Sequence, residues 1–262
     1  MGFFAKWRIH KKARGGDIVE VSERDGIRSL HLGDDTVHSA MRINAPSDLE
    51  LAYTRSMMAF LLFLRDPKHI LMIGLGGGSL LKFVHYTMPE IKTTVVEINA
   101  QVVAVAQSHF FVPPEDERFK LEIADGSQYV PANPASADVL MLDGYDANHH
   151  VESLASQAFY DSCADALTEN GILVVNLWGS DDRFDAYLKR IETSFNGLVL
   201  CLPAEKRGNI IVFAFKKTPG MTRWADLRER AKELESRYGL EFLRFVEGLK
   251  DTNLHSEKRL LL

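Results

Sequence analysis

Glycines cluster in one short segment of the sequence that could bind a ligand through its backbone. Residues 70–84 read ILMIGLGGGSLLKFV, so four glycines follow an apolar run and precede a helix-like pattern. Glycine permits positive φ, and without side chains the backbone N–H groups can approach a ligand closely. Gly74, Gly76 and Gly78 are therefore candidate cofactor-binding residues. A tight strand-to-helix turn that binds nothing would show the same pattern, because a glycine turn alone is a weak signal.

Three later apolar runs each end in an acidic residue, namely Glu97, Asp125 or Asp143. Glu97 stands about 20 residues after the first glycine, where a carboxylate can accept both hydroxyls of a ribose. Asp125, which Gly126 follows, suits the exocyclic amine of an adenine beside an apolar slot for the ring. The glycine turn holds no arginine or lysine, and Glu97 would repel a phosphate. The expected ligand is therefore a nucleoside such as S-adenosylmethionine or a derivative of it, rather than NADP.

A parallel sheet would bring these residues to one edge, and residues 68–217 predict such a sheet. Five apolar runs of the kind buried on both faces of a parallel sheet alternate with helix-like stretches: HILMIG, TTVVEIN, FKLEIAD, ADVLMLD and GILVVNLW. The last two runs, 197–203 and 209–216, are joined by too few residues for a crossover helix, so the last strand must be antiparallel. This pattern predicts an α/β fold of the class I S-adenosylmethionine methyltransferase-like (Rossmann-like) type, with a seven-stranded sheet.

The regions on either side of this sheet are smaller. Residues 17–44 alternate in strand fashion around two turn signals, which predicts a small β-region. Ser47 and Glu50 form a capping box that predicts a helix as far as about Arg65. We expect an N-terminal β-region with a basic arm at 1–46, a nucleoside-binding methyltransferase-type domain at 47–217, and a C-terminal helical extension at 218–262.

Composition excludes several classes of protein. The 262 residues carry a formal net charge of −5, which argues against nucleic-acid binding and leaves room for a cationic small molecule. Cys163 and Cys201 lack CxxC spacing, so we expect a cytoplasmic protein with neither a disulfide nor a zinc site. The longest apolar run, residues 57–64, is far shorter than a membrane span. We further expect a homodimer with no metal, nucleic-acid or membrane partner.

The segment from residue 139 to residue 176 resembles part of the polyamine aminopropyltransferases, the spermidine synthases. In that family the fourth strand ends in an Asp-Ser-Ser-Asp-Pro type motif, and a loop and a Phe-Tyr pair follow. The matching positions here are Asp143, Gly144, Tyr145, Asp146, Phe159 and Tyr160. The resemblance covers about residues 17–215. It implies a small β-domain before a methyltransferase-like domain, and transfer of the aminopropyl group of decarboxylated S-adenosylmethionine to an amine, with release of methylthioadenosine.

The resemblance also implies a role for each candidate residue. Asp143 would be the catalytic base, Tyr53 and Asp146 would bind the acceptor amine, and Glu97 and Asp125 would bind the nucleoside. An amine with a pKa of about 10 is protonated in water and cannot attack the carbon beside a sulfonium. A carboxylate within hydrogen-bonding distance must therefore receive the proton as the nitrogen attacks. Carboxylates also hold the remainder of a polyamine through charge-assisted hydrogen bonds.

Three positions depart from the family pattern. Gly77 stands where the family has the acid that holds the amino end of the aminopropyl group. Arg55 replaces a carboxylate, and His38 replaces a glutamine. These changes predict poor activity with putrescine, and they predict that Gly77→Asp raises activity. Because Arg55 and Gly77 would also suit the carboxylate of intact S-adenosylmethionine, a methyltransferase is one alternative. A nucleoside-binding protein that has lost the chemistry is the other.

Overall fold

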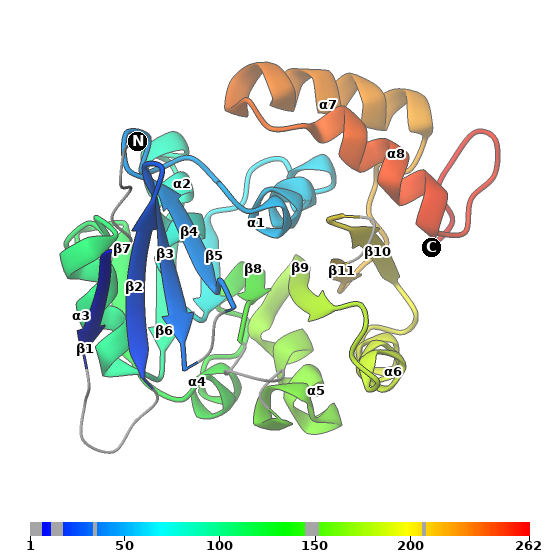
Figure 1. Cartoon of the computed structure of the whole chain (residues 1–262). Coiled ribbons are helices and arrows are strands. Elements are labelled where there is room, and N and C mark those ends of the chain that lie inside the picture. The colour runs from blue at the N-terminus through cyan, green and yellow to red at the C-terminus, as the bar shows by residue number, and fades with distance from the viewer. Residues whose placement is uncertain (1–6, 12–17, 34–35, 145–151, 206–207) are drawn as a thin grey trace.

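The computed structural model describes residues 7–11, 18–33, 36–144, 152–205 and 208–262, and they form two sheets covered by helices (Figure 1). Asp146, which the resemblance assigns to the amine site, lies outside the described residues, as does most of the basic arm. No helix in the described ranges is long and apolar enough to cross a membrane.

The main sheet has seven strands in the order β10-β11-β9-β8-β5-β6-β7. Its five parallel strands are β5 (His69–Ile73), β6 (Lys92–Glu97), β7 (Phe119–Ile123), β8 (Ala137–Leu142) and β9 (Leu167–Trp178). β11 (Asn209–Phe215) runs antiparallel to β9, and β10 (Val199–Pro203) runs antiparallel to β11. The predicted seven-stranded sheet with an antiparallel last strand is therefore confirmed. The order reverses at β5, and ligands of such sheets bind at the carboxyl ends of the strands beside this point.

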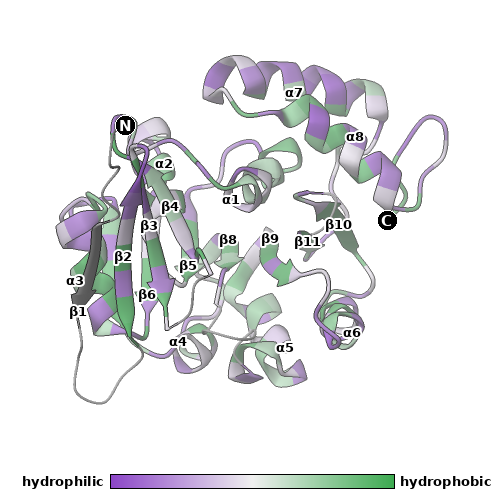
Figure 2. Cartoon of the chain, viewed as in Figure 1, coloured by the Kyte–Doolittle hydropathy of each residue, from purple (hydrophilic) through white to green (hydrophobic). Residues whose placement is uncertain are grey.

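Apolar side chains on both faces explain why the strands read as continuous apolar runs. Val139 and Met141 of β8 pack in one core, whereas Leu140 and Leu142 pack in the other. Figure 2 shows hydrophobic residues along β8 and β9, in contrast to the hydrophilic residues along much of α7 (Trp224–Tyr238). The helices that cover the second core are α4 (Gly126–Ala132), α5 (Gln157–Ala166) and α6 (Phe184–Ser194).

The opposite face of the main sheet is covered by helices from distant parts of the chain, and we call it the α1 face. These helices are α1 (Ala52–Met57), the 3-10 helix η1 (Met58–Leu62), α2 (Ser79–Thr87), α3 (Ala100–His109), α7 and α8 (Phe242–Thr252). In Figure 1 the C-terminal helices lie beside α1 and β10. Trp224, Leu227, Ala231 and Leu234 are the buried residues of α7, as their helical spacing predicts.

The N-terminal sheet contains β1 (Trp7–Lys11), β2 (Val19–Arg24), β3 (Ile27–Leu32) and β4 (Ser39–Arg42), all antiparallel. The positive φ angles of Asp25 (53°) and Gly26 (77°) match the two-residue turn that joins β2 to β3. Leu30 and Met41 pack against Val105 of α3 in a third core. The predicted small β-region is therefore confirmed, and it lies beside the glycine segment and α3.

The predicted capping-box helix is wrong at its start. α1 begins at Ala52, and Leu51 at its N-terminus provides no side-chain cap. The carboxylate of Glu50 accepts a hydrogen bond from Arg42 Nη2 at 2.7 Å, so it is engaged elsewhere. Arg55 Nη1 donates to the carbonyl oxygens of Leu49 and Glu50, which ties down the segment that leads into the helix. Arginine side chains five to eight positions away have therefore taken the place of the capping bonds that the pattern suggested.

Candidate active site

A cavity of about 1150 Å³ lies at the carboxyl ends of the parallel strands. Most of the predicted site residues line it, namely Tyr53, Gly74, Gly76, Glu97, Asp125, Gly126 and Asp143. Gly78 is not among the lining residues, and instead it begins α2 in the left-handed conformation. The cavity runs from the ends of β6 and β7 to the ends of β9 and β11. We name its two ends after the ligands that the sequence leads us to expect there. The end lined by Glu97 and Asp125 is the nucleoside half, and the end lined by Tyr53, Asp143 and Asn176 is the acceptor half.

The glycine turn follows β5 and needs glycine for two separate reasons. Gly74 and Gly78 have φ angles of 98° and 67°, which L side chains rarely adopt. A Cβ atom at Gly74 would also lie 2.5 Å from the carbonyl oxygen of Asp143. The absent side chains thus allow β5 and β8 to approach each other closely where the cavity begins.

Gly77 packs against residues that leave no room for a side chain. A Cβ atom there would lie 2.7 Å from Ser39 Oγ and 2.8 Å from Cδ1 of the fully buried Phe110. Phe110 is held in turn by Lys82, whose Nζ donates to its carbonyl oxygen at 2.6 Å. The position where the family has an acid is therefore filled by a buried aromatic ring. An aspartate at residue 77 would require this packing to change.

Glu97 ends β6 and binds the glycine turn through its carboxylate. Its Oε2 accepts from the N–H of Leu75 at 2.9 Å, and its Oε1 accepts from the N–H of Asn99 at 2.8 Å. The residue is only 8% exposed, and burial raises its pKa while the backbone hydrogen bonds oppose that rise. The backbone N–H groups of Ile98 and Gly76 also act on the carboxylate, so four backbone donors surround it where it lines the cavity.

Asp125 lies at the neighbouring strand end, where its side chain caps α4. Its Oδ1 accepts from the N–H of Ser127 at 2.8 Å, which leaves the other oxygen for a ligand. A Cβ atom at Gly126 would lie 2.5 Å from Ile73 Cγ2, so glycine lets α4 pack closely on β5. Ile98, which is 68% exposed, and Leu154 also line the cavity and give this half an apolar surface. These residues fit a nucleoside with a ribose and a flat, amine-bearing base.

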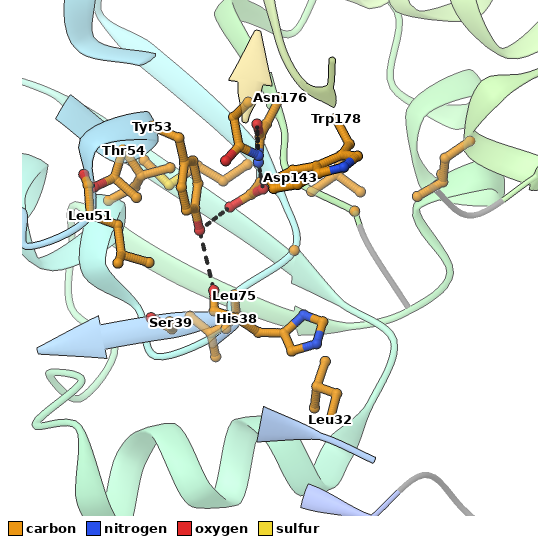
Figure 3. A pocket seen from close by; sticks show the side chains of 18 of the residues that line it. Leu32, His38, Ser39, Leu51, Tyr53, Thr54, Leu75, Asp143, Asn176 and Trp178 are labelled. Atoms are coloured by element: carbon orange, nitrogen blue, oxygen red, sulfur yellow. Dashed lines mark hydrogen bonds between the residues drawn. The ribbon is translucent and has the colours of Figure 1, made fainter. Parts of the chain in front are cut away.

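Asp143 follows β8 and is held by side chains from two other elements (Figure 3). Its Oδ2 accepts from the Tyr53 hydroxyl at 3.1 Å, although the two residues are 90 positions apart. Its Oδ1 accepts from Asn176 Nδ2 at 2.8 Å. Desolvation raises the pKa of Asp143, whereas these two hydrogen bonds and the nearby His38 act in the opposite direction. The carboxylate is thus held in one position at the wall of the cavity.

The Tyr53 hydroxyl has two acceptors within reach in this arrangement. Its hydroxyl oxygen lies 3.3 Å from the carbonyl oxygen of His38, in addition to its contact with Asp143 (Figure 3). A hydroxyl has a single proton, so it can donate to only one of them at a time. Rotation of the O–H bond would therefore release one lone pair of Asp143 Oδ2.

Two site residues were not found from the sequence, and a signal was present for only one of them. Asn176 is 2% exposed and interrupts the apolar run GILVVNLW near its end. A polar residue within an otherwise buried strand needs a partner, and here that partner is Asp143. Ile98 stands directly after Glu97, and its 68% exposure marks it as an apolar cavity residue. No sequence pattern indicates that an isoleucine will be exposed in a cavity.

Arg55 does not enter the cavity. Its Nε donates to Glu241 Oε1, beside the start of α8, at 2.8 Å. Its Nη1 binds the carbonyl oxygens of Leu49 and Glu50, as described above. The hypothesis that Arg55 receives a substrate carboxylate is therefore not supported by its position. Among the described residues, no group of three or more His, Cys, Asp or Glu side chains could hold a metal.

The sheet order and the site at its carboxyl edge define a protein of the S-adenosylmethionine methyltransferase-like fold class. A family model described as the spermine/spermidine synthase domain matches residues 50–222. The polyamine aminopropyltransferase of Chromobacterium violaceum is 45% identical over 255 residues, which cover 97% of this chain and 98% of that one. The chain therefore belongs to the spermine/spermidine synthase family, as the sequence resemblance predicts.

Solved structures show the same fold in two kinds of protein. A spermidine synthase in complex with the transition state analogue AdoDATO has a TM-score of 0.70 at 19% identity, covering 92% of this chain and 84% of that one. Human methyltransferase-like protein 13 in complex with SAH has a TM-score of 0.66 at 28% identity, covering 72% of this chain and 92% of that one. The fold alone therefore does not separate aminopropyl transfer from methyl transfer.

Proposed function

We propose that this chain transfers the aminopropyl group of decarboxylated S-adenosylmethionine to a polyamine such as putrescine, and that it releases methylthioadenosine. Membership of the family and the name of the 45% identical relative support this activity. The observation that carries the chemistry is the Asp143 carboxylate, which lines the cavity and is fixed by Tyr53 and Asn176. A base held in this way is what an amine nucleophile needs.

In the proposed reaction, the nitrogen of the acceptor amine attacks the aminopropyl carbon that is bound to the sulfonium. A C–N bond forms, and the C–S bond breaks as its electron pair passes to sulfur, which becomes a neutral thioether. Because an ammonium nitrogen has no lone pair, it first gives one proton to Asp143 and then attacks as the neutral amine. Because desolvation raises the pKa of Asp143, its carboxylate is a stronger base than that of an aspartate in water.

The nucleoside half of the cavity is proposed to bind the donor. Glu97 would accept the ribose hydroxyls, and the free oxygen of Asp125 would accept the exocyclic amine of adenine. Both carboxylates line the same cavity as Asp143, so donor and acceptor could meet within it. Holding two reactants in one orientation lowers the entropic part of the barrier, and negative charge offsets the repulsion between two cations.

Methyl transfer from intact S-adenosylmethionine is not favoured. That reading depended on Arg55 and Gly77 as the site of the donor carboxylate. Arg55 is paired with Glu241 outside the cavity, and Gly77 does not line the cavity either. The family assignment also favours aminopropyl transfer.

The proposal is tested by incubating the full chain with decarboxylated S-adenosylmethionine and putrescine, cadaverine or spermidine, while methylthioadenosine is measured by chromatography. Release of methylthioadenosine with at least one amine is the expected result. Parallel reactions contain intact S-adenosylmethionine, and we expect no S-adenosylhomocysteine from them. The opposite pair of results would replace the proposal with methyl transfer. Binding of methylthioadenosine in calorimetry without either product would leave a nucleoside-binding protein.

A further inference from the structure

Three adjacent strands of the main sheet carry polar residues on the α1 face, at the edge of the sheet that lines the cavity. In β9, Ile172 and Val174 pack in the core on this face, and Asn176 is the next residue of the same alternation. In β8, Val139 and Met141 pack there, and Asp143 continues that pattern past the end of the strand. Alternate residues of a strand share a face, so the apolar core on this face gives way to polar groups at the edge of the cavity.

The third strand, β11, runs in the opposite direction, and its first residue is an asparagine, Asn209. β11 is antiparallel to β9, with Ile211 opposite Asn176 and Asn209 opposite Trp178. Directly opposite residues point to the same face, so Asn209 lies diagonally across from Asn176 on the α1 face. β8, β9 and β11 are neighbours in the sheet, which places Asp143, Asn176 and Asn209 in one row.

Two hydrogen bonds connect this row. Asn209 Nδ2 donates to Asn176 Oδ1 at 2.9 Å, and Asn176 Nδ2 donates to Asp143 Oδ1 at 2.8 Å. The first bond fixes the direction of the Asn176 amide. A reversed amide would set an oxygen against the Asp143 carboxylate and an NH2 group against the Asn209 NH2 group. Asn176 is 2% exposed, so water could not readily replace either partner.

We propose that Asn209 is a positioning residue for the transfer reaction, because it fixes the Asn176 amide and so leaves Asp143 Oδ2 to accept the proton of the amine. This inference rests on the proposed function. Asn176 Nδ2 is always a donor and keeps Oδ1 engaged. The Tyr53 hydroxyl, in contrast, can turn from Oδ2 toward the carbonyl oxygen of His38 when Oδ2 takes the proton. The two oxygens of one carboxylate therefore have different roles.

The groups that face Asp143 also determine how the loss of the Asn209 side chain changes the pKa of Asp143. They are Asn176 from β9, Tyr53 from α1 and His38 beside β4, and each opposes the rise of the Asp143 pKa that desolvation causes. If the Asn176 amide is free to turn its oxygen toward Asp143, one of these three is lost. The carboxylate would then protonate at a higher pH, and the acid limb of the pH–rate profile would move upward.

The test uses Asn209→Leu, which keeps the size of the side chain and removes its hydrogen bonds. We expect kcat to fall roughly tenfold, as the loss of one hydrogen bond to a charged network implies. We also expect the acid limb of kcat/KM for the amine to move upward, and the affinity for methylthioadenosine to stay unchanged. Asn209→Gln keeps the carboxamide and faces the cavity, so it should recover part of the rate and the wild-type acid limb.

Asn133→Leu is the matched control. It also removes one side-chain hydrogen bond, from Asn133 Nδ2 to the carbonyl oxygen of Tyr129, but Asn133 does not line the cavity. This variant should change thermal stability without changing kcat or the pH profile. If Asn209→Leu behaves in the same way as Asn133→Leu, the positioning role is overturned.

A second measurement tests the role of Asn209 without relying on enzymatic turnover. The Asp143 carboxyl carbon is titrated by NMR in wild type and in Asn209→Leu, with Asp143→Asn used to assign its signal. A higher pKa in the variant supports the network, and an unchanged pKa overturns it. Absence of transfer activity in the wild-type chain would instead overturn the proposed function. The two failures are therefore distinguishable.

Discussion

The two halves of the cavity hold their carboxylates in different ways. In the nucleoside half, Glu97 and Asp125 accept hydrogen bonds from backbone N–H groups, mostly of residues within two positions in sequence. In the acceptor half, Asp143 accepts its bonds from the side chains of Tyr53 and Asn176, which lie 90 and 33 positions away. A strand end, its own turn and the neighbouring glycine turn are sufficient to orient the first kind of carboxylate. The second kind requires the completed tertiary structure.

This difference decides how mutations can affect each half. A backbone N–H survives nearly every substitution, so the environment of Glu97 changes little unless Glu97 itself is replaced. The partners of Asp143 are side chains, and each can be removed separately. The pKa of Asp143 can therefore be altered one group at a time, and with it the pH range in which the chain accepts a proton.

Asp143→Asn should have the largest effect. It keeps the shape of the side chain and removes the base, so turnover should fall by about two to four powers of ten. The affinity for methylthioadenosine should barely change, because Asp143 lies in the acceptor half. Steady-state kinetics and calorimetry measure the two quantities. The control is Asp165→Asn on the exposed surface of α5, and equal losses in both variants would remove Asp143 from the mechanism.

Glu97→Ala should weaken ligand binding in the nucleoside half of the cavity. We expect the affinity for methylthioadenosine to fall about 10-fold to 100-fold, because a hydrogen bond to a charged group typically contributes about 1.5–3 kcal/mol to binding. The KM of the amine should change much less than the affinity for the nucleoside. Calorimetry of Glu97→Ala beside Asp143→Asn gives the comparison directly. A variant that binds the nucleoside normally would show that the two halves are assigned wrongly.

The family pattern and the packing of this chain predict opposite effects of Gly77→Asp, so this variant distinguishes between them. The sequence alone predicts that it raises activity, whereas the contacts of residue 77 with Phe110 and Ser39 predict overpacking of about 1–3 kcal/mol. We now expect a lower melting temperature and no gain in activity. Gly220→Asp is the control, since a Cβ atom there meets nothing within 4 Å. If Phe110→Ala restores the stability of Gly77→Asp, the clash is located at that ring.

Glu241→Gln should have a smaller effect that reaches only the acceptor half. It removes the ion pair with Arg55, which holds the helix that carries Tyr53, so we expect the KM of the amine to rise by about twofold to fivefold. The affinity for the nucleoside should not change. Glu247→Gln breaks the ion pair with Arg228, also in the C-terminal helices, and serves as the control. A rise in KM of the same size in both variants would contradict a specific role for Glu241.

The contribution of Lys82 to the free energy of unfolding should not depend on pH near neutrality and should change with pH in alkaline solution. Burial lowers the pKa of this lysine from 10.5 to about 8. Between these two values the unfolded chain binds more protons than the folded one, so the free energy of unfolding should rise with pH in this range. Below about pH 8 both states are protonated and this contribution is constant. The difference between denaturation curves of wild type and Lys82→Met measures it, and parallel curves up to pH 10 would contradict it.

Local patterns were sufficient for most of the fold and for the nucleoside half. The alternation of apolar runs identified the parallel strands, and the short connection before Asn209 required the antiparallel last strand. Parallel strands end at one edge of a sheet, so Glu97, Asp125 and Asp143 had to share it. The glycine turn was recognisable for the same reason, because its conformation depends on a few consecutive residues. Gly78 is the exception, since it shapes the turn without lining the cavity.

The acceptor half was decided by the tertiary structure. The sequence alone determined that a methyltransferase-like sheet would form and that acids would line its edge, because those features depend on neighbours in the chain. Only the packed structure decided that Asn176 would hold Asp143, that Arg55 would bind Glu241, and that Phe110 would occupy the space beside Gly77. Each of these contacts joins residues more than 30 positions apart. Their formation depends on how whole strands and helices pack, which no local pattern records.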